Sequence, residues 1–187
     1  FAEIFITSAG LEWWQERLIT DGSFLLSYLP DLNLSPEQSE DCLYLNIIKP
    51  KKLENGSLPV MVWIHGGGYR GGDGGGFYIS DSFAKEGIIL VTINYRLGPL
   101  GFMAHPLLSA ESPKKVSGNY GTLDQIHALK WVQANIHKFG GDPNNVTIFG
   151  ESAGGASVET LVSTGLAKDL FHKAIAQSGY TVGRARK

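Results

Sequence analysis

The chain has 187 residues, a hydrophobic fraction of 43%, a charged fraction of 18% and a formal net charge of −2. This length and composition fit one globular domain with its own core. The small negative charge, without a run of Lys or Arg, argues against a nucleic-acid partner. No apolar run approaches the length of a membrane span, and no signal peptide is visible. Sequons at Asn33, Asn55 and Asn145 would matter only in a secreted protein, so the compartment stays open.

The first 36 residues carry the weakest signals. One helical face gathers apolar side chains and predicts a packing helix without chemistry, with Leu11, Trp14, Leu18 and Ile19. A turn or helix-start signal follows near Ser35, and the apolar run 42–48 is typical of a strand. Cys42 is the only cysteine, so the sequence holds neither an internal disulfide nor a thiolate metal site.

Two fully apolar runs come next, at residues 58–64 and 88–93. Continuous rather than alternating apolar character is typical of strands buried on both faces, as in a parallel sheet covered by helices. The first run leads into a glycine-rich loop, and residues 80–86 favour a short helix. The connection over residues 94–117 contains three prolines, and its length favours an ordered functional loop over a linker.

A longer helix is expected to begin at Thr122, where Thr122 and Gln125 have the spacing of a capping box and Asp124 lies in the first turn. Its buried face is predicted to contain Leu123, Ile126, Leu129, Val132 and Ile136. Gly140 and the residues after it end the helix. Residues 146–149 and 173–177 then predict two further strands, so strands and helices alternate as in an α/β sheet.

The chain is organised around Gly150-Glu151-Ser152-Ala153-Gly154, a Gly-x-Ser-x-Gly pattern directly after a predicted strand. Such a pattern predicts a strand that turns sharply into a helix and lifts the serine hydroxyl above the edge of the sheet. Because the chain has 24 glycines, chance alone would supply roughly 0.2 copies of this pattern. The interpretation therefore depends on the surrounding sequence.

His65-Gly66-Gly67-Gly68 also follows a strand, so it is expected on the same rim as Ser152, where ligand sites form outside the carboxyl ends of the strands. Successive glycines let backbone amides point at one spot, as an oxyanion that develops during attack on a carbonyl requires. Gly66, Gly68 and Gly71 also match the spacing of a dinucleotide fingerprint. The glycines that follow forbid the helix that this motif must open, so neither a nucleotide cofactor nor a metal is expected.

Several segments together resemble the type-B carboxylesterase family, the cholinesterase-like branch of the α/β-hydrolases, namely residues 39–47, 66–69, 94–98, 140–143 and 150–155. The resemblance implies an α/β-hydrolase-like fold with a mostly parallel sheet flanked by helices, and a small-molecule ester as substrate. It further implies that Ser152 is the nucleophile of an acyl-enzyme and that the amides of Gly67, Gly68 and Ala153 form the oxyanion hole. Glu151 would brace the elbow by hydrogen bonding, and is not the triad acid.

The sequence departs from the family's pattern in three ways. The family's triad acid and histidine lie beyond the serine strand, whereas this chain ends at Lys187, and His172 is expected at the opposite end of the sheet from Ser152. Residues 1–35 do not show the family's usual opening, and the usual partner of Cys42 is missing. Residues 1–187 are therefore interpreted as the amino-terminal part of one α/β-hydrolase domain, truncated after the strand that follows the elbow and inactive alone.

Two other functions remain open beside the ester hydrolase. They are a non-catalytic, cholinesterase-like binding or adhesion protein and an inert fragment; the presence of Ser152 favours the enzyme. The aromatic residues Trp63, Tyr69, Phe77 and Tyr78 are candidates for an acyl pocket, although core packing is the better interpretation of Trp63. Arg96 and Asp124 are interpreted as a structural pair. Acyl and alcohol specificity and oligomeric state stay open.

Overall fold

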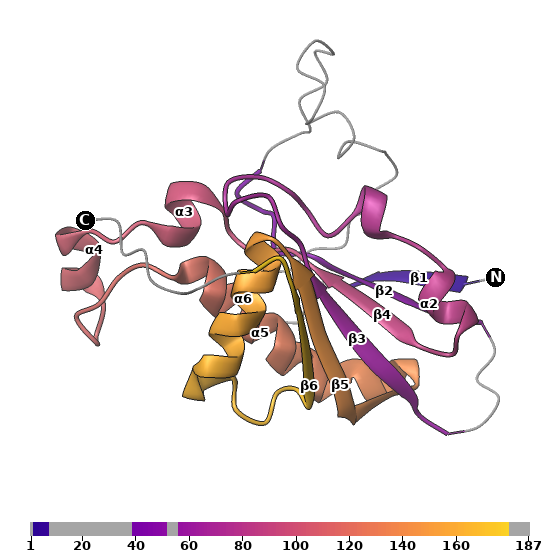
Figure 1. Cartoon of the computed structure of the whole chain (residues 1–187). Helices are drawn as coiled ribbons and strands as arrows, with labels where there is room; N and C mark the ends of the chain where they lie inside the picture. Colours follow the sequence, from indigo (N-terminus) through magenta and orange to yellow (C-terminus); the bar gives the residue numbers. More distant parts are fainter. Residues whose placement is uncertain (1, 8–38, 52–55, 180–187) are drawn as a thin grey trace, which may run out of the picture.

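In the computed structural model, the structure describes residues 2–7, 39–51 and 56–179, and the helix expected near Leu11 lies outside them. A six-stranded sheet has the order β1-β2-β4-β3-β5-β6 (Figure 1). Its strands are β1 (Ala2–Thr7), β2 (Leu45–Pro50), β3 (Leu58–Ile64), β4 (Ile89–Ile93), β5 (Gly141–Glu151) and β6 (Lys173–Gln177). β2 is antiparallel to β1 and β4, whereas β4, β3, β5 and β6 run parallel. This confirms the mostly parallel α/β sheet.

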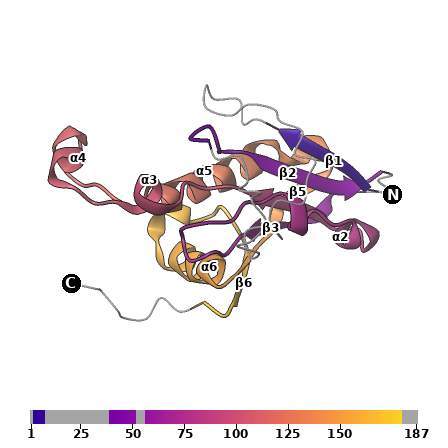
Figure 2. The ribbon, with the colours of Figure 1, turned by 90° about the horizontal axis from the view of Figure 1, so that it is seen from above.

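The helices fill the connections between the parallel strands. They are α2 (Ser82–Lys85), α3 (Gly98–Phe102), α4 (Pro106–Glu111), α5 (Tyr120–Asn135) and α6 (Ala153–Ser163), with 3-10 turns η1 (Gly76–Tyr78), η2 (Ile136–Phe139) and η3 (Gly165–Ala167). The long connection contains α3, which packs against α5, and α4, which projects away from the sheet in Figures 1 and 2. No helix of the described ranges is long and apolar enough to span a membrane.

The two faces of the sheet are covered by different helices. Side chains of a strand alternate between the faces, and in β3 the residues Val62 and Ile64 belong to a core cluster with α5 and α6, whereas Trp63 belongs to a second cluster beside α2. The first cluster is the larger one and contains Leu129 and Val132 of α5 and Leu161 of α6. Helix cover on both faces explains why the strands are continuously apolar.

The order of the strands places a switch point beside β3. From β3 the chain passes to β4 on one side, and then crosses to β5 on the other side of β3. The loop after β3 and the helix after β5 therefore leave the sheet in opposite directions, and ligand sites of open α/β sheets form at such a switch point, outside the carboxyl ends of the strands. Both sequence motifs, the glycine loop and the serine pattern, lie at the ends of these two strands.

The bounds of several elements differ from those that the sequence predicts. β1 was not predicted, the strand expected at residues 42–48 is β2 (Leu45–Pro50), and the helix expected at 80–86 covers only α2 (Ser82–Lys85). β2 begins later because residues 42–44 bind the start of the loop that follows β4. The carbonyls of Cys42 and Tyr44 accept hydrogen bonds from Asn94 in that loop.

The predicted start of the long helix is wrong. α5 begins at Tyr120 behind Asn119, which has a φ of 58° and makes no side-chain cap. Gln125 is buried and bonds a neighbouring helix rather than capping its own, and the predicted core residue Leu123 is exposed. The other predicted core residues are buried, as expected, namely Ile126, Leu129, Val132 and Ile136. The buried face also includes the polar residues Asp124 and Gln125, which the apolar pattern cannot indicate.

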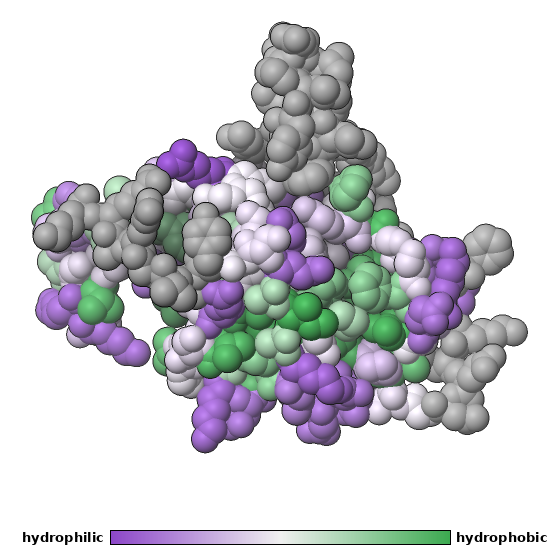
Figure 3. All heavy atoms as spheres, viewed as in Figure 1, coloured by the Kyte–Doolittle hydropathy of each residue, from purple (hydrophilic) through white to green (hydrophobic). Residues whose placement is uncertain are grey.

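The edge strand β6 contrasts with the rest of the sheet. Among the strands that the structure describes it pairs only with β5, and all five of its residues are exposed. Figure 3 shows apolar surface gathered over β6 and the elements beside it, where Ile175 and Val162 are among the exposed large apolar residues. An uncovered parallel edge of this kind is a template for pairing with another strand.

Candidate active site

The serine lies on a sharp turn between β5 and α6. Ser152 has φ 56° and ψ −120°, a conformation that is uncommon for a residue with a side chain and that concentrates at functional sites. A Cβ on Gly154 would lie 2.0 Å from the carbonyl oxygen of Ile64, and one on Gly150 would lie 2.6 Å from the Gly154 backbone. Glycine is therefore required at both positions, because α6 crosses directly over the end of β3.

The glycine loop after β3 passes beside this serine. A Cβ on Gly66 would lie 3.3 Å from the Cβ of Ser152 and 2.8 Å from the carbonyl oxygen of Glu151. The loop and the elbow are therefore in contact at the switch point. Gly67 and Gly68 continue the loop with φ values of 105° and 63°, which glycine adopts without strain.

Hydrogen bonds to two carbonyls orient the peptide planes of this loop. The Gly66 carbonyl accepts from Nδ1 of His65 at 2.8 Å, and the Gly67 carbonyl accepts from the amides of Arg70 and Gly71 at 3.1 and 3.2 Å. In a trans peptide the N–H points away from the C=O of the same plane. The Gly67 N–H therefore points away from the His65 ring, and the Gly68 N–H points away from the amides of Arg70 and Gly71.

Three amide donors at the rim are left without acceptors. Within the described residues, no hydrogen bond uses the N–H of Gly67, Gly68 or Ala153. The Ala153 amide lies in the first turn of α6, where the helix dipole favours negative charge. The Ser152 hydroxyl makes no cap to the helix. The rim therefore offers a hydroxyl beside donors on two elements, which is the arrangement that acyl transfer needs.

Polar residues inside the apolar strands hold the glycine loop in place. The Gly74 carbonyl accepts from Nδ2 of Asn46 at 3.1 Å and from Oγ1 of Thr92, and the Gly74 amide donates to Oδ1 of Asn94 at 2.6 Å. Sequence reasoning did not find these anchors. Buried polar side chains within β2 and β4 were the available signal, because such groups require partners.

His65 has a structural role, as the sequence predicts. Its ring stacks on Tyr95 with centroids 4.4 Å apart, and the Tyr95 hydroxyl donates to the His65 carbonyl at 2.8 Å. Burial lowers the pKa of His65 and raises that of Tyr95, so both are neutral at pH 7. Since Nδ1 donates to the Gly66 carbonyl, His65 fixes the loop rather than acting as a base for Ser152.

The other histidines belong to segments other than the elbow and the glycine loop. Nδ1 of His172 accepts from the amide of Val146, whereas the Ser152 amide donates to the carbonyl of Gln177 at the far end of β6. The length of β6, roughly 17 Å, separates His172 from the serine, as expected. His105 caps α4, and the remaining two histidines lie on α5 and η2.

The remaining candidates of the sequence analysis have varied surroundings. Arg96 and Asp124 form the predicted structural pair through two hydrogen bonds of 2.8 Å. Trp63 packs in the core against Tyr78 and Phe149, with ring centroids 5.0 and 4.8 Å apart. Glu151 is exposed and its carboxylate makes no hydrogen bond within the described residues, so its bracing role stays a prediction.

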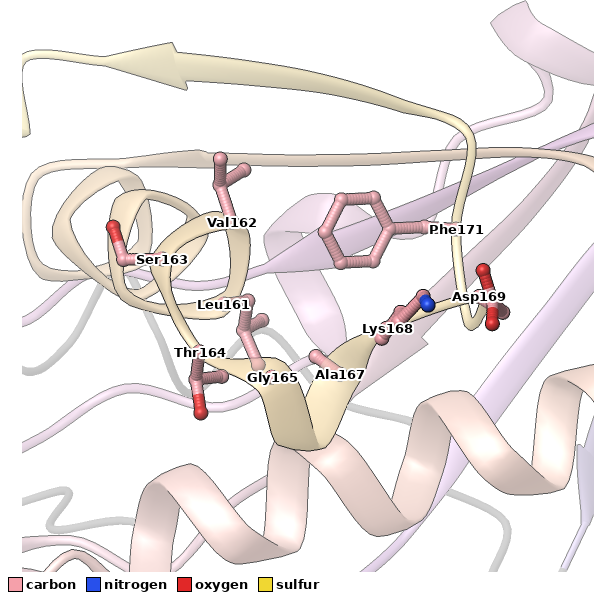
Figure 4. A pocket seen from close by; sticks show the side chains of 9 residues that line it. All are labelled: Leu161, Val162, Ser163, Thr164, Gly165, Ala167, Lys168, Asp169 and Phe171. Atoms are coloured by element: carbon pink, nitrogen blue, oxygen red, sulfur yellow. The ribbon is translucent and has the colours of Figure 1, made fainter.

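A shallow pocket of about 380 Å³ lies at the other end of α6 (Figure 4). Side chains of the last turn of α6, of η3 and of the segment before β6 line it, among them Leu161, Lys168 and Phe171. Helix α6 starts directly after Ser152, so most of its length, roughly 15 Å, separates this pocket from the serine. The described residues contain no group of His, Cys, Asp and Glu that could hold a metal ion.

The carboxylesterase family model matches residues 14–185. The chain belongs to the carboxylesterase family. The fumonisin B1 esterase of Sphingopyxis macrogoltabida is 56% identical over 141 residues, which are 75% of this chain and 26% of that protein. The para-nitrobenzyl esterase of Bacillus subtilis (strain 168) is 53% identical over 146 residues, 77% of this chain and 29% of that protein.

Solved structures of carboxylesterases have the same fold. A thermophilic PNB esterase superposes with a TM-score of 0.70 at 53% identity, over 77% of this chain and 29% of that chain. A further PNB esterase structure gives a TM-score of 0.73 at 51% identity, over 84% and 31%. The fold is thus that of the α/β-hydrolases, and the chain spans less than a third of the length of these relatives.

Proposed function

We propose that this chain supplies the nucleophile and the oxyanion hole of a carboxylic ester hydrolase. Oγ of Ser152 attacks the ester carbonyl, and the amides of Gly67, Gly68 and Ala153 bind the oxyanion that forms. A base takes up the Oγ proton and passes it to the oxygen of the leaving group, so the C–O bond breaks, the alcohol leaves and an acyl group remains bonded to Oγ. Water attacks this acyl-enzyme and releases the carboxylic acid and the free serine.

The contact between the glycine loop and the elbow carries this proposal. Gly66 lies against Ser152, and the next two amides and that of Ala153 have no acceptor within the described residues. A non-catalytic binding protein would need neither the strained backbone at Ser152 nor these unpaired donors. The relatives act on different esters by their names, so we propose a small-molecule ester as the substrate class and no particular ester.

A general base for Ser152 has to come from outside residues 1–187. His65 is engaged with the Gly66 carbonyl, and His172 lies at the opposite end of β6. We therefore expect an acid and a histidine beyond Lys187 to complete the triad, and negligible turnover by the 187-residue chain alone, because a serine without a base is a weak nucleophile.

The test uses the protein at the full length that its gene encodes. Hydrolysis of p-nitrophenyl acetate is measured for the natural protein, for Ser152→Ala and for Ser163→Ala, an exposed serine at the end of α6. Ser152→Ala is expected to lower kcat by about 10⁴-fold or more, and Ser163→Ala to leave it unchanged. Equal rates for the natural protein and Ser152→Ala, or measurable Ser152-dependent hydrolysis by the 187-residue chain, would overturn the proposal.

A further inference from the structure

The donors of the proposed oxyanion hole come from two separate elements. Gly67 and Gly68 belong to the loop after β3, whereas Ala153 begins α6. An oxyanion can reach all three amides only if the distance between the loop and the helix is held constant. A direct link between these two elements would therefore control the geometry of the hole.

Such a link joins Tyr69 to Ser157. Tyr69 follows Gly68 directly, and its hydroxyl accepts a hydrogen bond of 3.3 Å from Oγ of Ser157. Ser157 lies in α6 four residues after Ala153, so both residues are on the same face of the helix, one turn apart. The bond thus connects Tyr69, the residue after the donors Gly67 and Gly68, with α6, the helix that begins with the donor Ala153.

Gln125 of α5 gives this bond its direction. Nε2 of Gln125 donates to Oγ of Ser157 at 3.0 Å, which leaves the Ser157 proton for Tyr69. Gln125 and Ser157 are both buried. Because Gln125 and Ser157 are buried, breaking the bond between them would leave a polar group without a partner, and this holds the Ser157 hydroxyl in one arrangement.

The backbone of Tyr69 is also held in an unusual conformation. Its φ of 61° is uncommon for a tyrosine and requires support from its surroundings. The Tyr69 carbonyl accepts from the Gly98 amide at 2.7 Å, and its ring packs against Phe102 with centroids 4.8 Å apart. The hydroxyl is the part of Tyr69 that reaches α6.

We propose that Tyr69 and Ser157 are positioning residues that set the width of the oxyanion hole. This inference rests on the proposed function, because it assigns the hole to the same amides. Neither side chain touches the reacting atoms. Without the bond, the loop keeps its other attachments but loses its side-chain link between Tyr69 and α6, so the Gly67 and Gly68 amides are held less firmly relative to Ala153, which weakens the binding of the transition state more than that of the ester.

The test uses Tyr69→Phe in the full-length protein, since this variant keeps the ring and loses only the hydroxyl. One hydrogen bond corresponds to about a three- to tenfold change, so we expect kcat to fall about three- to tenfold with little change in KM. The affinity for an aryl trifluoromethyl ketone, whose adduct with Ser152 carries an oxyanion, should fall by the same factor. Tyr120→Phe is the matched control and should retain both values.

Two further variants separate positioning from simple stabilisation. Ser157→Ala should lower kcat in the same way, and the double variant should be no slower than the slower single variant, because both changes remove one bond. A melting temperature that falls in Tyr69→Phe while kcat and inhibitor affinity at 25 °C stay unchanged would overturn the inference.

The failure of this inference is distinguishable from the failure of the proposed function. If Ser152→Ala abolishes hydrolysis and Tyr69→Phe retains the full kcat, the inference is wrong and the proposed function stands. If Ser152→Ala retains activity, the proposed function is wrong, and the inference fails with it.

Discussion

Two regions that meet at β5 differ in how closely their backbones are packed. At the rim where β3 and β5 end, a Cβ on Gly154 would lie 2.0 Å from the Ile64 carbonyl oxygen. One strand away, all five residues of β6 are exposed, and the large side chain of Ile175 keeps 46% of its surface accessible. In this sheet the closely packed rim at the end of β5 and the exposed edge strand β6 are therefore direct neighbours.

This difference separates two requirements of the proposed chemistry. The proposed nucleophile and amide donors depend on backbone geometry, and the described residues place Gly66 against Ser152 with the backbone conformations that such a site requires. The base and the acid require side chains that reach Ser152 from other loops, and His65 and His172 are engaged in other hydrogen bonds.

The largest effect is expected from Gly154→Ala. The new methyl group would overlap the Ile64 carbonyl, and it would also lie 2.9 Å from that of His65, so α6 must move away from β3. We expect a loss of about 4 kcal/mol or more in the free energy of unfolding, or an insoluble protein.

Gly165→Ala is the matched control, because a Cβ there has no atom within 4 Å. Both substitutions restrict the unfolded chain equally, so the difference between them in urea denaturation isolates the contact at the rim. Equal stability of the two variants would show that the rim is not as closely packed as the structure indicates.

Arg96→Met should weaken the support of the rim from the side of α5. Arg96 donates to both carboxylate oxygens of Asp124, whose side chain is only 7% exposed, and removing the guanidinium leaves this buried charge with one backbone donor. We expect a loss of about 2 kcal/mol in stability, measured by urea denaturation.

The control is Lys85→Met, which breaks an ion pair of 2.9 Å with Asp81 at the surface. Since both of its side chains are exposed to water and salt, no measurable loss is expected. A similar small change in both variants would contradict the structural role of the Arg96 pair.

Much of this architecture could be predicted from the sequence, and the exceptions have a common physical cause. The apolar run 58–64 gave the exact bounds of β3, and the patterns at Ser152 and Gly66 predicted two motifs on one rim. The start of α5 and the exposure of Leu123 were predicted wrongly. Apolar periodicity cannot show that a helix buries polar residues, because their burial depends on partners that are distant in the sequence.

The partners of those polar residues became visible only in the structure. Gln125 bonds Ser157, and Asn46 bonds the loop at Gly74, 28 residues away in the chain. Glu151 shows the limit of the resemblance, since its bracing hydrogen bond is not seen within the described residues. The role of a residue in a local backbone turn, such as that of Gly150, could be predicted from the sequence. Hydrogen bonds between side chains of different elements could not.

The pH dependence of stability should show how firmly the rim buries His65. Burial lowers the pKa of its imidazole below the ordinary value near 6.5. Between the two pKa values the unfolded chain binds more protons, so stability decreases as pH falls below about 6.5, by on the order of 1.4 kcal/mol per pH unit for one proton.

His65→Asn keeps an N–H donor and removes the titration, so its stability should depend less on pH between 7 and 5 in urea denaturation. His137→Asn, at an exposed position on η2, should keep the natural slope. The same slope in His65→Asn and in the natural chain would mean that His65 is protonated as readily in the folded state as in the unfolded state.

The smallest effect on folding, and the clearest on association, is expected at the edge. The 187-residue chain alone should self-associate through β6, because this strand pairs on one side only and exposes Ile175. Ile175→Lys places a charge on this edge without removing a core contact, so self-association should decrease while the free energy of unfolding changes by less than about 0.5 kcal/mol. Light scattering after size exclusion measures self-association, and urea denaturation measures the free energy of unfolding.

The control is Val162→Lys on α6, which adds the same charge away from the strand edge and should leave self-association unchanged. An equal decrease in both variants would attribute self-association to apolar surface in general rather than to pairing at β6.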